Sequence, residues 1–140
     1  MKTRTKRLLL IICGSLLLIF GGVSWLGYTL LSPNSFLNRA STIDSILTWG
    51  RLASFPSSAQ QLTIDGGGSM FTRSFRTSFV ALPEEINDWL RRSPGTSEAP
   101  VKIPSPGFRH FEIVPGGGAQ HAEVTVDDTL HVVSIYVYWS

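Results

Sequence analysis

The longest hydrophobic run of the chain lies near its start. From Leu8 to Leu31 there are 24 residues without a formal charge. At about 1.5 Å per residue, a helix of this length exceeds the roughly 30 Å thickness of a bilayer's hydrocarbon core. Residues 1–7 contain four basic side chains and no acidic one, which favours a cytoplasmic N-terminus. The pattern therefore predicts a basic cytoplasmic tip (1–7), a single transmembrane helix (8–31) and a C-terminal part on the outer side of the cell membrane.

A cleaved signal peptide is the alternative interpretation of this segment. Signal peptides have an apolar core of about 7–15 residues that ends at a site of small residues. The run here is longer, and the small residues at positions 22–24 are followed by Trp25 and further apolar side chains. These features favour an anchor that is retained.

The next segment, 32–58, is rich in Ser, Asn and Thr, and Pro33 ends the first helix. Such a composition is typical of a connector. Within it, Ile43, Ile46 and Leu47 have helical spacing and predict a short amphipathic helix over about 41–52. This helix could lie on the membrane surface or pack on the following domain, and the sequence does not separate the two.

Residues 59–140 have the pattern of a small α+β domain. A Gly triplet follows each of two strands, at Asp65–Gly68 and at Pro115–Gly118, and predicts a hairpin turn at both places. The loop 94–107 contains four prolines and is predicted to be extended. The order is ββ-α-βββ, an antiparallel sheet with one helix packed on a face. The alternating patterns predict strands over 60–65, 70–81, 108–114, about 122–126 and 130–139.

The clearest helix signal covers Pro83–Arg92. Pro83 suits the first helical position, two acidic residues follow it, and two arginines end the segment. Ile86, Trp89 and Leu90 form the stripe expected to be buried. Glu84 and Glu85 are adjacent, so they point about 100° apart and are not expected to form an acid–base pair.

Composition and charge narrow the function classes. Hydrophobic residues make up 43% of the 140 residues and charged residues 16%, with a mean hydropathy of +0.14. Outside the basic tip, eight basic residues face ten acidic ones, a net charge of −2. A nucleic-acid partner is therefore not expected, because its phosphates need a basic face. The single cysteine, Cys13, lies in the predicted membrane segment, so we expect no disulfide in the exported part.

Two His-x-Glu pairs are the sharpest polar motif. Strand alternation places His110 with Glu112, and His121 with Glu123, on the solvent side of two neighbouring strands. If the register aligned the pairs, they could converge on a zinc-like ion. Exposed His and Glu are common on strands, however, and we assign no metal ligand or cofactor. His131 is expected to be a partly buried structural residue.

Aromatic residues fall into two groups. The first is expected in the core and consists of Phe71, Phe75, Phe79, Trp89 and Phe111. The second, Tyr136, Tyr138 and Trp139, ends the chain on a strand that is apolar on both faces and is predicted to be central in the sheet. One short helix does not cover both faces of this strand. Either the connector helix packs there or the aromatic patch contacts another protein.

No catalytic motif is present: there is no GxSxG elbow, no HExxH and no phosphate loop, and neither Gly triplet is followed by a lysine. We therefore expect no enzyme. The segment from Pro56 to Gly95, with Met70–Phe75 after the first Gly triplet and Pro83–Leu90, resembles an uncharacterised family of small, single-pass membrane-anchored bacterial proteins. The resemblance implies an anchor and an exported α+β domain, and it implies no activity or ligand.

The sequence thus predicts a single-pass envelope protein whose exported domain binds another envelope protein. The alternative is a metal or small-ligand sensing domain on the outer side of the membrane, using the two His-x-Glu pairs.

Overall fold

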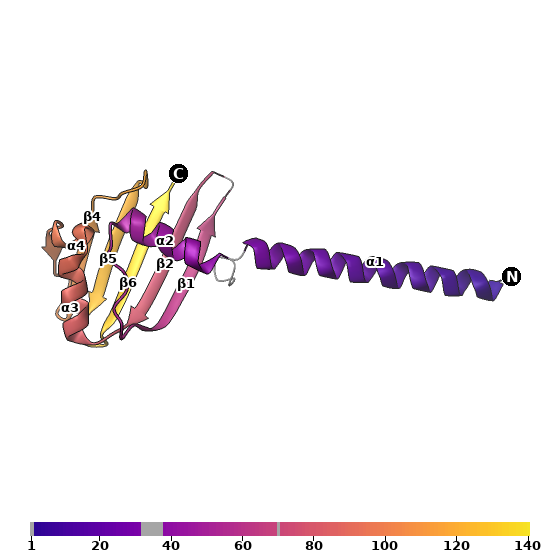
Figure 1. The fold of residues 1–140 in the computed structure, drawn as a ribbon, viewed down its shortest axis with the longest axis horizontal. Helices are drawn as coiled ribbons and strands as arrows, with labels where there is room; N and C mark the ends of the chain where they lie inside the picture. The colour runs from indigo at the N-terminus through magenta and orange to yellow at the C-terminus, as the bar shows by residue number, and fades with distance from the viewer. Residues whose placement is uncertain (1, 32–37, 70) are drawn as a thin grey trace.

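The computed structural model describes the backbone of residues 2–31, 38–69 and 71–140, and the side chains of 14–28, 38–69 and 71–140. Met70, part of the predicted connector (32–37) and the side chains of the basic tip and of Cys13 lie outside these residues. The described elements (Figure 1) are α1 (Lys2–Leu31), α2 (Arg39–Gly50), β1 (Gln60–Gly68), β2 (Arg73–Val80), α3 (Pro83–Arg92), α4 (Pro94–Ser97), β3 (Val101–Lys102), β4 (Phe108–Ile113), β5 (His121–Asp127) and β6 (Val132–Trp139).

The protein has an α+β fold, as the sequence predicts, with six antiparallel strands in the order β1-β2-β6-β5-β4-β3. The last strand, β6, lies between β2 and β5, which confirms its predicted central position. The sixth strand, β3, is an addition: it consists of two residues that pair with β4. It lies within the segment 94–107, which the sequence predicts to be an extended loop, and the short helix α4 lies there too.

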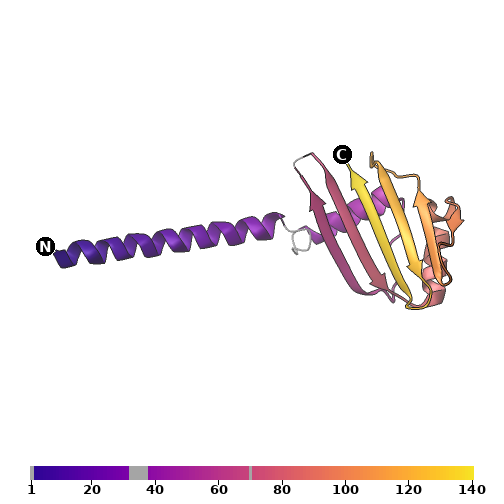
Figure 2. The same ribbon diagram turned by 180° about the vertical axis from the view of Figure 1, so that it is seen from behind.

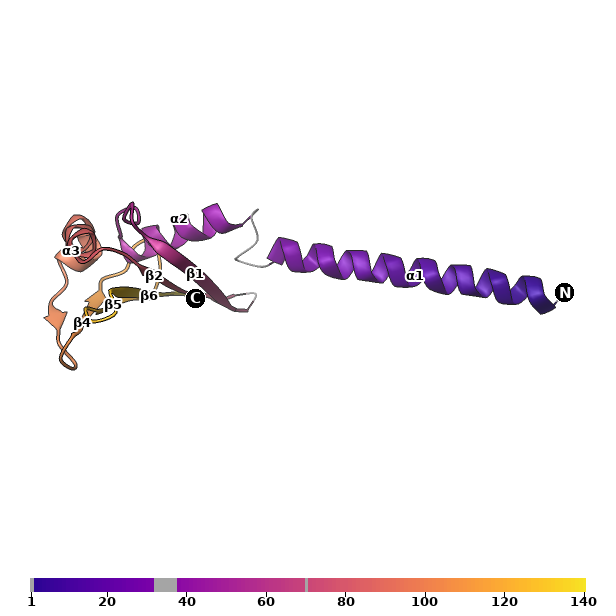
Figure 3. The same ribbon diagram turned by 90° about the horizontal axis from the view of Figure 1, so that it is seen from below.

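Both longer helices of the domain lie on the same side of the sheet. Figure 3 shows α2 and α3 above the strands, and Figure 2 shows the opposite face with no helix in front of it. The reason is strand alternation: each strand places every second side chain under the helices. The buried side chains of the sheet are Ile64, Phe75, Thr77, Phe79, Phe111, Ile113, Ala122, Val124, Val126, Val133, Ile135 and Val137.

The core is organised around aromatic contacts. Phe79 meets the ring of Trp89 edge-on at 5.5 Å and the ring of Phe55 at 5.3 Å, while Trp49 stacks on Phe75 at 5.6 Å. The prediction that Phe75, Phe79, Trp89 and Phe111 are buried is confirmed. The same prediction is wrong for Phe71, which is 76% exposed, because it lies in the β1–β2 connection and not in the strand.

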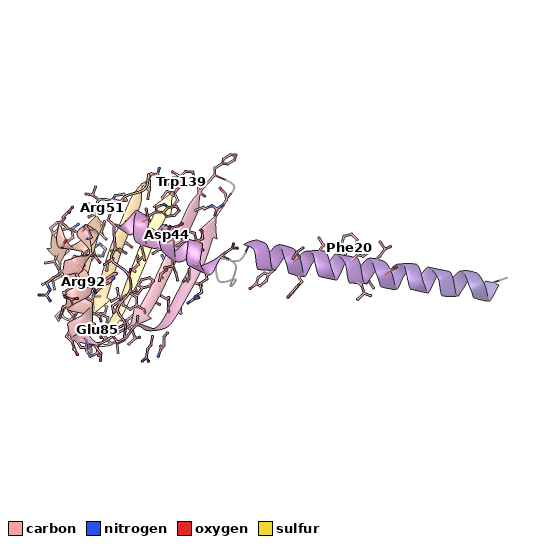
Figure 4. The ribbon with its side chains drawn as sticks, in the orientation of Figure 1. Phe20, Asp44, Arg51, Glu85, Arg92 and Trp139 are labelled. Carbon is pink, nitrogen blue, oxygen red and sulfur yellow. The ribbon has the colours of Figure 1, made fainter. Side chains whose placement is uncertain are left out.

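The helix α3 begins and ends where the sequence predicts. Its stripe of Ile86, Trp89 and Leu90 is buried, and Asp88 forms ion pairs with Arg92 at 2.6 Å and with Arg91 at 3.2 Å. Figure 4 shows Glu85 and Arg92 toward opposite ends of this helix, so their charges complement its dipole.

The connector helix α2 packs on the domain. Ile46 is fully buried, and α2 contacts β5 and β6, so the structure favours the second of the two arrangements left open by the sequence. Its C-terminus adjoins α4, where Gly95 donates its N–H to the carbonyl of Arg51 at 2.9 Å. A Cβ at Gly95 would lie 2.1 Å from the carbonyl oxygen of Gly50. The hydrophobic core therefore includes residues that precede position 59.

The two Gly triplets differ in structure. Residues 117–118 form the predicted turn between β4 and β5. Residues 66–68, in contrast, continue β1 and pair with Phe75, Ser74 and Arg73 of β2. The hairpin turn is displaced to Ser69–Thr72, because Ser69 donates its backbone N–H to the Thr72 carbonyl at 2.9 Å and the two hydroxyls bond at 3.0 Å. The prediction of a hairpin turn at Asp65–Gly68 is therefore wrong, because these residues belong to strand β1.

The helix α1 is 30 residues long. Within the residues whose side chains the structure describes, which in α1 are 14–28, no helix is both long and apolar enough to cross a membrane.

Candidate functional site

The face of the sheet opposite the helices presents ordered rows of side chains. In its middle row, residues on five strands are paired in register: Asp65 with Arg76, Arg76 with Tyr136, Tyr136 with Glu123, and Glu123 with Glu112. Direct cross-strand partners lie about 4.5–5.5 Å apart at Cβ. We call this surface the open face, with Tyr136 at its centre.

The ring of Tyr136 contacts two side chains, the guanidinium of Arg76 and the imidazole ring of His121. The guanidinium carbon of Arg76 lies 5.2 Å from the ring centroid, and the imidazole of His121 lies 5.8 Å from it. Arg76 faces the ring as a cation–π partner. His121 is also the cross-strand partner of Tyr138. The two tyrosines are half-buried, so the centre of the open face is aromatic and fixed by its own contacts.

Charged pairs surround this centre. The Lys102 ammonium lies 2.6 Å from the Glu112 carboxylate, and this hydrogen bond lowers the pKa of Glu112 below its ordinary value, with smaller contributions from His121 and His110. On β5, the His121 ring lies 3.3 Å from the Glu123 carboxylate. Glu112 and Glu123 face each other across the strands, and each has a basic partner that offsets their repulsion.

The two His-x-Glu pairs share this face, as alternation predicts, but they do not converge. His110 pairs with Thr125 and bonds its hydroxyl at 3.1 Å, whereas His121 lies four residues away from Thr125 on the same strand. At about 3.3 Å per residue, the backbone positions of the two histidines are offset by about 13 Å along the strands. In the described part of the chain, no three His, Cys, Asp or Glu side chains come together as metal ligands.

The terminal aromatics divide between the two faces. Tyr136 and Tyr138 belong to the open face, while Trp139 is on the helix side at the end of β6 and is 38% exposed. The connector helix covers the face of Val137, so no helix or strand in the described part of the chain covers the tyrosines. His131 is partly buried, as predicted, but it lies in the turn before β6 with φ of 56°.

The two adjacent glutamates have separate structural environments. Glu84 is exposed in the first turn of α3. Glu85 accepts hydrogen bonds from the backbone and hydroxyl of Ser58, both at 3.0 Å, and from the Ser57 hydroxyl at 3.3 Å. The backbone bond from Ser58 is the main reason that the pKa of Glu85 is lowered. Glu85 thus fastens the 57–58 turn to α3.

A cavity of about 560 Å³ between the start of α2 and the β1–β2 hairpin was not expected from the sequence. The residues around it come from two segments about 30 positions apart, and only the fold brings them together. They are Asn38, Ser41, Thr42, Gly66, Gly67, Gly68, Ser69, Thr72, Arg73 and Phe75.

No protein-family model, curated protein or solved structure matches this chain.

Proposed function

We propose that the chain is a non-enzymatic, single-pass membrane protein whose sheet domain lies outside the cell membrane and binds another envelope protein through the open face. The observation that carries this proposal is the fixed aromatic centre at Tyr136, between Arg76 and His121, on a sheet face that none of the described helices covers.

The anchor is supported by the uncharged run of residues 8–31 and by the continuous helix that contains it. The side chains of Leu17, Leu18 and Phe20 are among the most exposed apolar groups of the protein, and Figure 4 places Phe20 on α1 away from the sheet. Water is a poor environment for such a helix, whereas a bilayer would cover it. The basic tip would keep the N-terminus in the cytoplasm.

An antiparallel sheet with one solvated face is ordinary in itself. What favours recognition is the composition of this face, because Tyr and Arg are enriched at the centres of protein interfaces and charged residues at their rims. Here Tyr136 and Arg76 are central, and Asp65, Glu112 and Lys102 surround them. Rings that are already held lose little side-chain entropy when a partner binds.

Site-specific photo-crosslinking in the full-length protein tests this proposal. A photoreactive residue at Ser134, on the open face, is expected to give one discrete adduct with a membrane or envelope protein. The same residue at Asn87, exposed on α3, is the matched control and is expected to give none. Tyr136→Ala should abolish the Ser134 adduct without changing the unfolding temperature by more than a few degrees.

Two results would contradict the proposal. An adduct from Asn87 but not from Ser134 would place the interface on the helix side. An adduct from Ser134 that persists in Tyr136→Ala would show that the aromatic centre is not part of the interface.

A further inference from the structure

The two strands beside the centre of the open face have opposite charges. Figure 2 shows β2 and β5 on either side of β6, and in the middle row Arg76 of β2 and Glu123 of β5 are the direct partners of Tyr136. Because neighbouring strands lie about 4.8 Å apart, the backbone positions of these two residues are equally far from that of Tyr136. Next to the central ring, the face is therefore positive on one side and negative on the other.

The positive side chain has no carboxylate partner in the part of the chain that the structure describes. Arg76 is exposed and lies over the ring of Tyr136 at 5.2 Å, and the ion pairs of the described residues do not include it. Asp65, its cross-strand partner on β1, is also exposed and also absent from these pairs. On the negative side, Glu123 has a histidine as its partner, His121 at 3.3 Å. A guanidinium in this position favours an acidic group from another molecule.

A surface with this charge pattern is complementary to itself. A two-fold axis that lies in the interface and runs nearly along β6 brings the β2 side of one copy against the β5 side of the other. Arg76 then faces Glu123 of the second copy, Glu123 faces the second Arg76, and the two Tyr136 rings meet at the axis, where offset stacking is favourable. An axis across the strands would instead place Arg76 against Arg76 and Glu123 against Glu123, and like charges at an interface are unfavourable. The charges therefore select the first axis.

The other positions of the face are compatible with this axis. The rotation places Asp65 against β4, where the carboxylate of Glu112 is already paired with the Lys102 ammonium at 2.6 Å. Asp65 thus meets a neutral pair and not an isolated carboxylate. The row next to Tyr136 has uncharged hydroxyl side chains on β2, β6 and β5, and it faces the same row of the second copy. Its members are Ser78, Ser134 and Thr125. Small side chains of this kind allow two sheets to approach to the usual 10 Å or so.

We propose that the partner bound by the open face is a second copy of this chain, in a symmetric dimer held by Arg76, Glu123 and Tyr136. The inference rests on the proposed function, because it uses the same face and names the protein that the face binds. The proposed anchors favour such a dimer, since two copies confined to one membrane have a higher effective concentration for each other.

The test uses the purified full chain in phosphatidylcholine vesicles, so that no other protein is present. With a photoreactive residue at Ser134, illumination is expected to give an adduct of twice the mass of the chain. Arg76→Glu and Glu123→Arg should each lower the yield of this adduct by about tenfold or more, because each brings like charges together at two symmetric positions. Asp44→Arg is the matched control: it reverses an exposed charge on α2, on the helix side of the sheet (Figure 4), and should leave the yield unchanged.

The decisive variant carries both charge reversals. In Arg76→Glu/Glu123→Arg, opposite charges face each other again in exchanged positions, so the yield should return to within about threefold of that of the unaltered chain. A mixture of the two single variants should recover in the same way, because each then supplies the charge that the other lacks. Neither recovery is expected if the two residues act separately.

A mapping experiment needs no charge variant. Ser78 lies on β2, in the hydroxyl row of the face. A photoreactive residue at this position should label β5 of the second copy, residues 121–127, when the axis runs along β6. An axis across the strands would lead to labelling of β2.

Four results would overturn the proposal: no adduct of double mass, an equal loss in Asp44→Arg, a double variant as weak as the single ones, or labelling of β2 from Ser78. The failure of the dimer is distinguishable from that of the proposed function. If the purified chain gives no dimer and Ser134 still gives an adduct with a different protein in cells, the named partner is wrong and the open face remains the interface. No adduct from Ser134 in either setting would contradict both.

Discussion

The covered and open faces of the sheet are made by alternate residues of the same six strands. On β6, Val137 is fully buried beneath the helices, while Tyr136, the preceding residue, is half exposed. On β2, Phe79 is buried among aromatic rings, whereas Arg76 lies over one ring at the surface. The strands alternate apolar and polar side chains, and α2 and α3 both pack on the apolar side (Figure 3).

This difference separates stability from recognition. Side chains under the helices are removed from water, and a buried Val, Ile or Phe contributes about 1.5–3 kcal/mol. The contacts of the open face join groups that remain solvated, and exposed ion pairs contribute little. We therefore expect substitutions on the covered face to change the unfolding free energy and substitutions on the open face to change binding.

The largest effect is expected for Trp89→Ala. Trp89 is fully buried, meets Phe79 edge-on and donates its indole N–H to the carbonyl of Ala53 at 3.0 Å. Its removal leaves a cavity and an unpaired carbonyl, so we expect a loss of about 3–5 kcal/mol in the unfolding free energy. Denaturant unfolding of the full chain in detergent, followed by circular dichroism, measures it.

The control for this prediction is Tyr136→Ala on the open face, with an expected loss of about 1 kcal/mol or less. Equal losses for the two variants would mean that the open face also forms part of the core.

A smaller effect of opposite sign is expected for Thr77→Val. Thr77 is fully buried on β2, and its hydroxyl has no hydrogen-bond partner in the described structure. Valine keeps the branched shape and removes the unpaired polar group, so the variant should be more stable by about 1 kcal/mol. The same unfolding measurement tests it.

Thr125→Val is the matched change on the open face. The Thr125 hydroxyl bonds His110 at 3.1 Å and is partly exposed, so its loss should be slightly destabilising. A decrease in stability for Thr77→Val would show that its hydroxyl has a partner after all.

The elements with local signals could be predicted from the sequence, and the contacts between distant segments could not. Pro83, the paired charges and the apolar stripe define α3 within ten residues. The helical spacing of Ile43, Ile46 and Leu47 in α2 was equally visible, but whether these side chains face lipid or protein depends on a sheet whose strands come later in the chain. The two Gly triplets have the same sequence and different structures, because the hydroxyls of Ser69 and Thr72 form the turn after the first one.

The candidate site follows the same rule. Alternation was enough to place His110 and His121 on one face, but their separation along the strands depends on the register, which pairs Ile113 with Ala122. The cavity depends on the packing of α2 beside the β1–β2 hairpin, and no spacing within either segment indicates it. The sequence therefore shows which residue types are present and which face of a strand they occupy. Which of them lie close together depends on the three-dimensional fold.

The smallest effect on stability is expected where an open-face pair is broken. Lys102 and Glu112 are both more than half exposed, and Lys102 is the main reason that the pKa of Glu112 is lowered from its ordinary 4.5. The pair's contribution is present above that value and is lost as the pH falls through the lowered pKa of the folded state. Lys102→Gln should therefore raise the pKa of Glu112 toward 4.5 and leave the unfolding free energy at pH 7 nearly unchanged.

Carboxyl-carbon NMR titration of the full chain measures this pKa in both proteins. His121 and His110 still face Glu112 in the variant and lower its pKa, so the return to 4.5 should be incomplete. Glu85 is the internal control, because its lowered pKa depends on Ser58 and not on Lys102. A shift at Glu85 as large as that at Glu112 would mean a global change in the protein. A large loss of stability in the variant would mean that the open face contributes to folding as the covered face does, and the contrast between the two faces would fail.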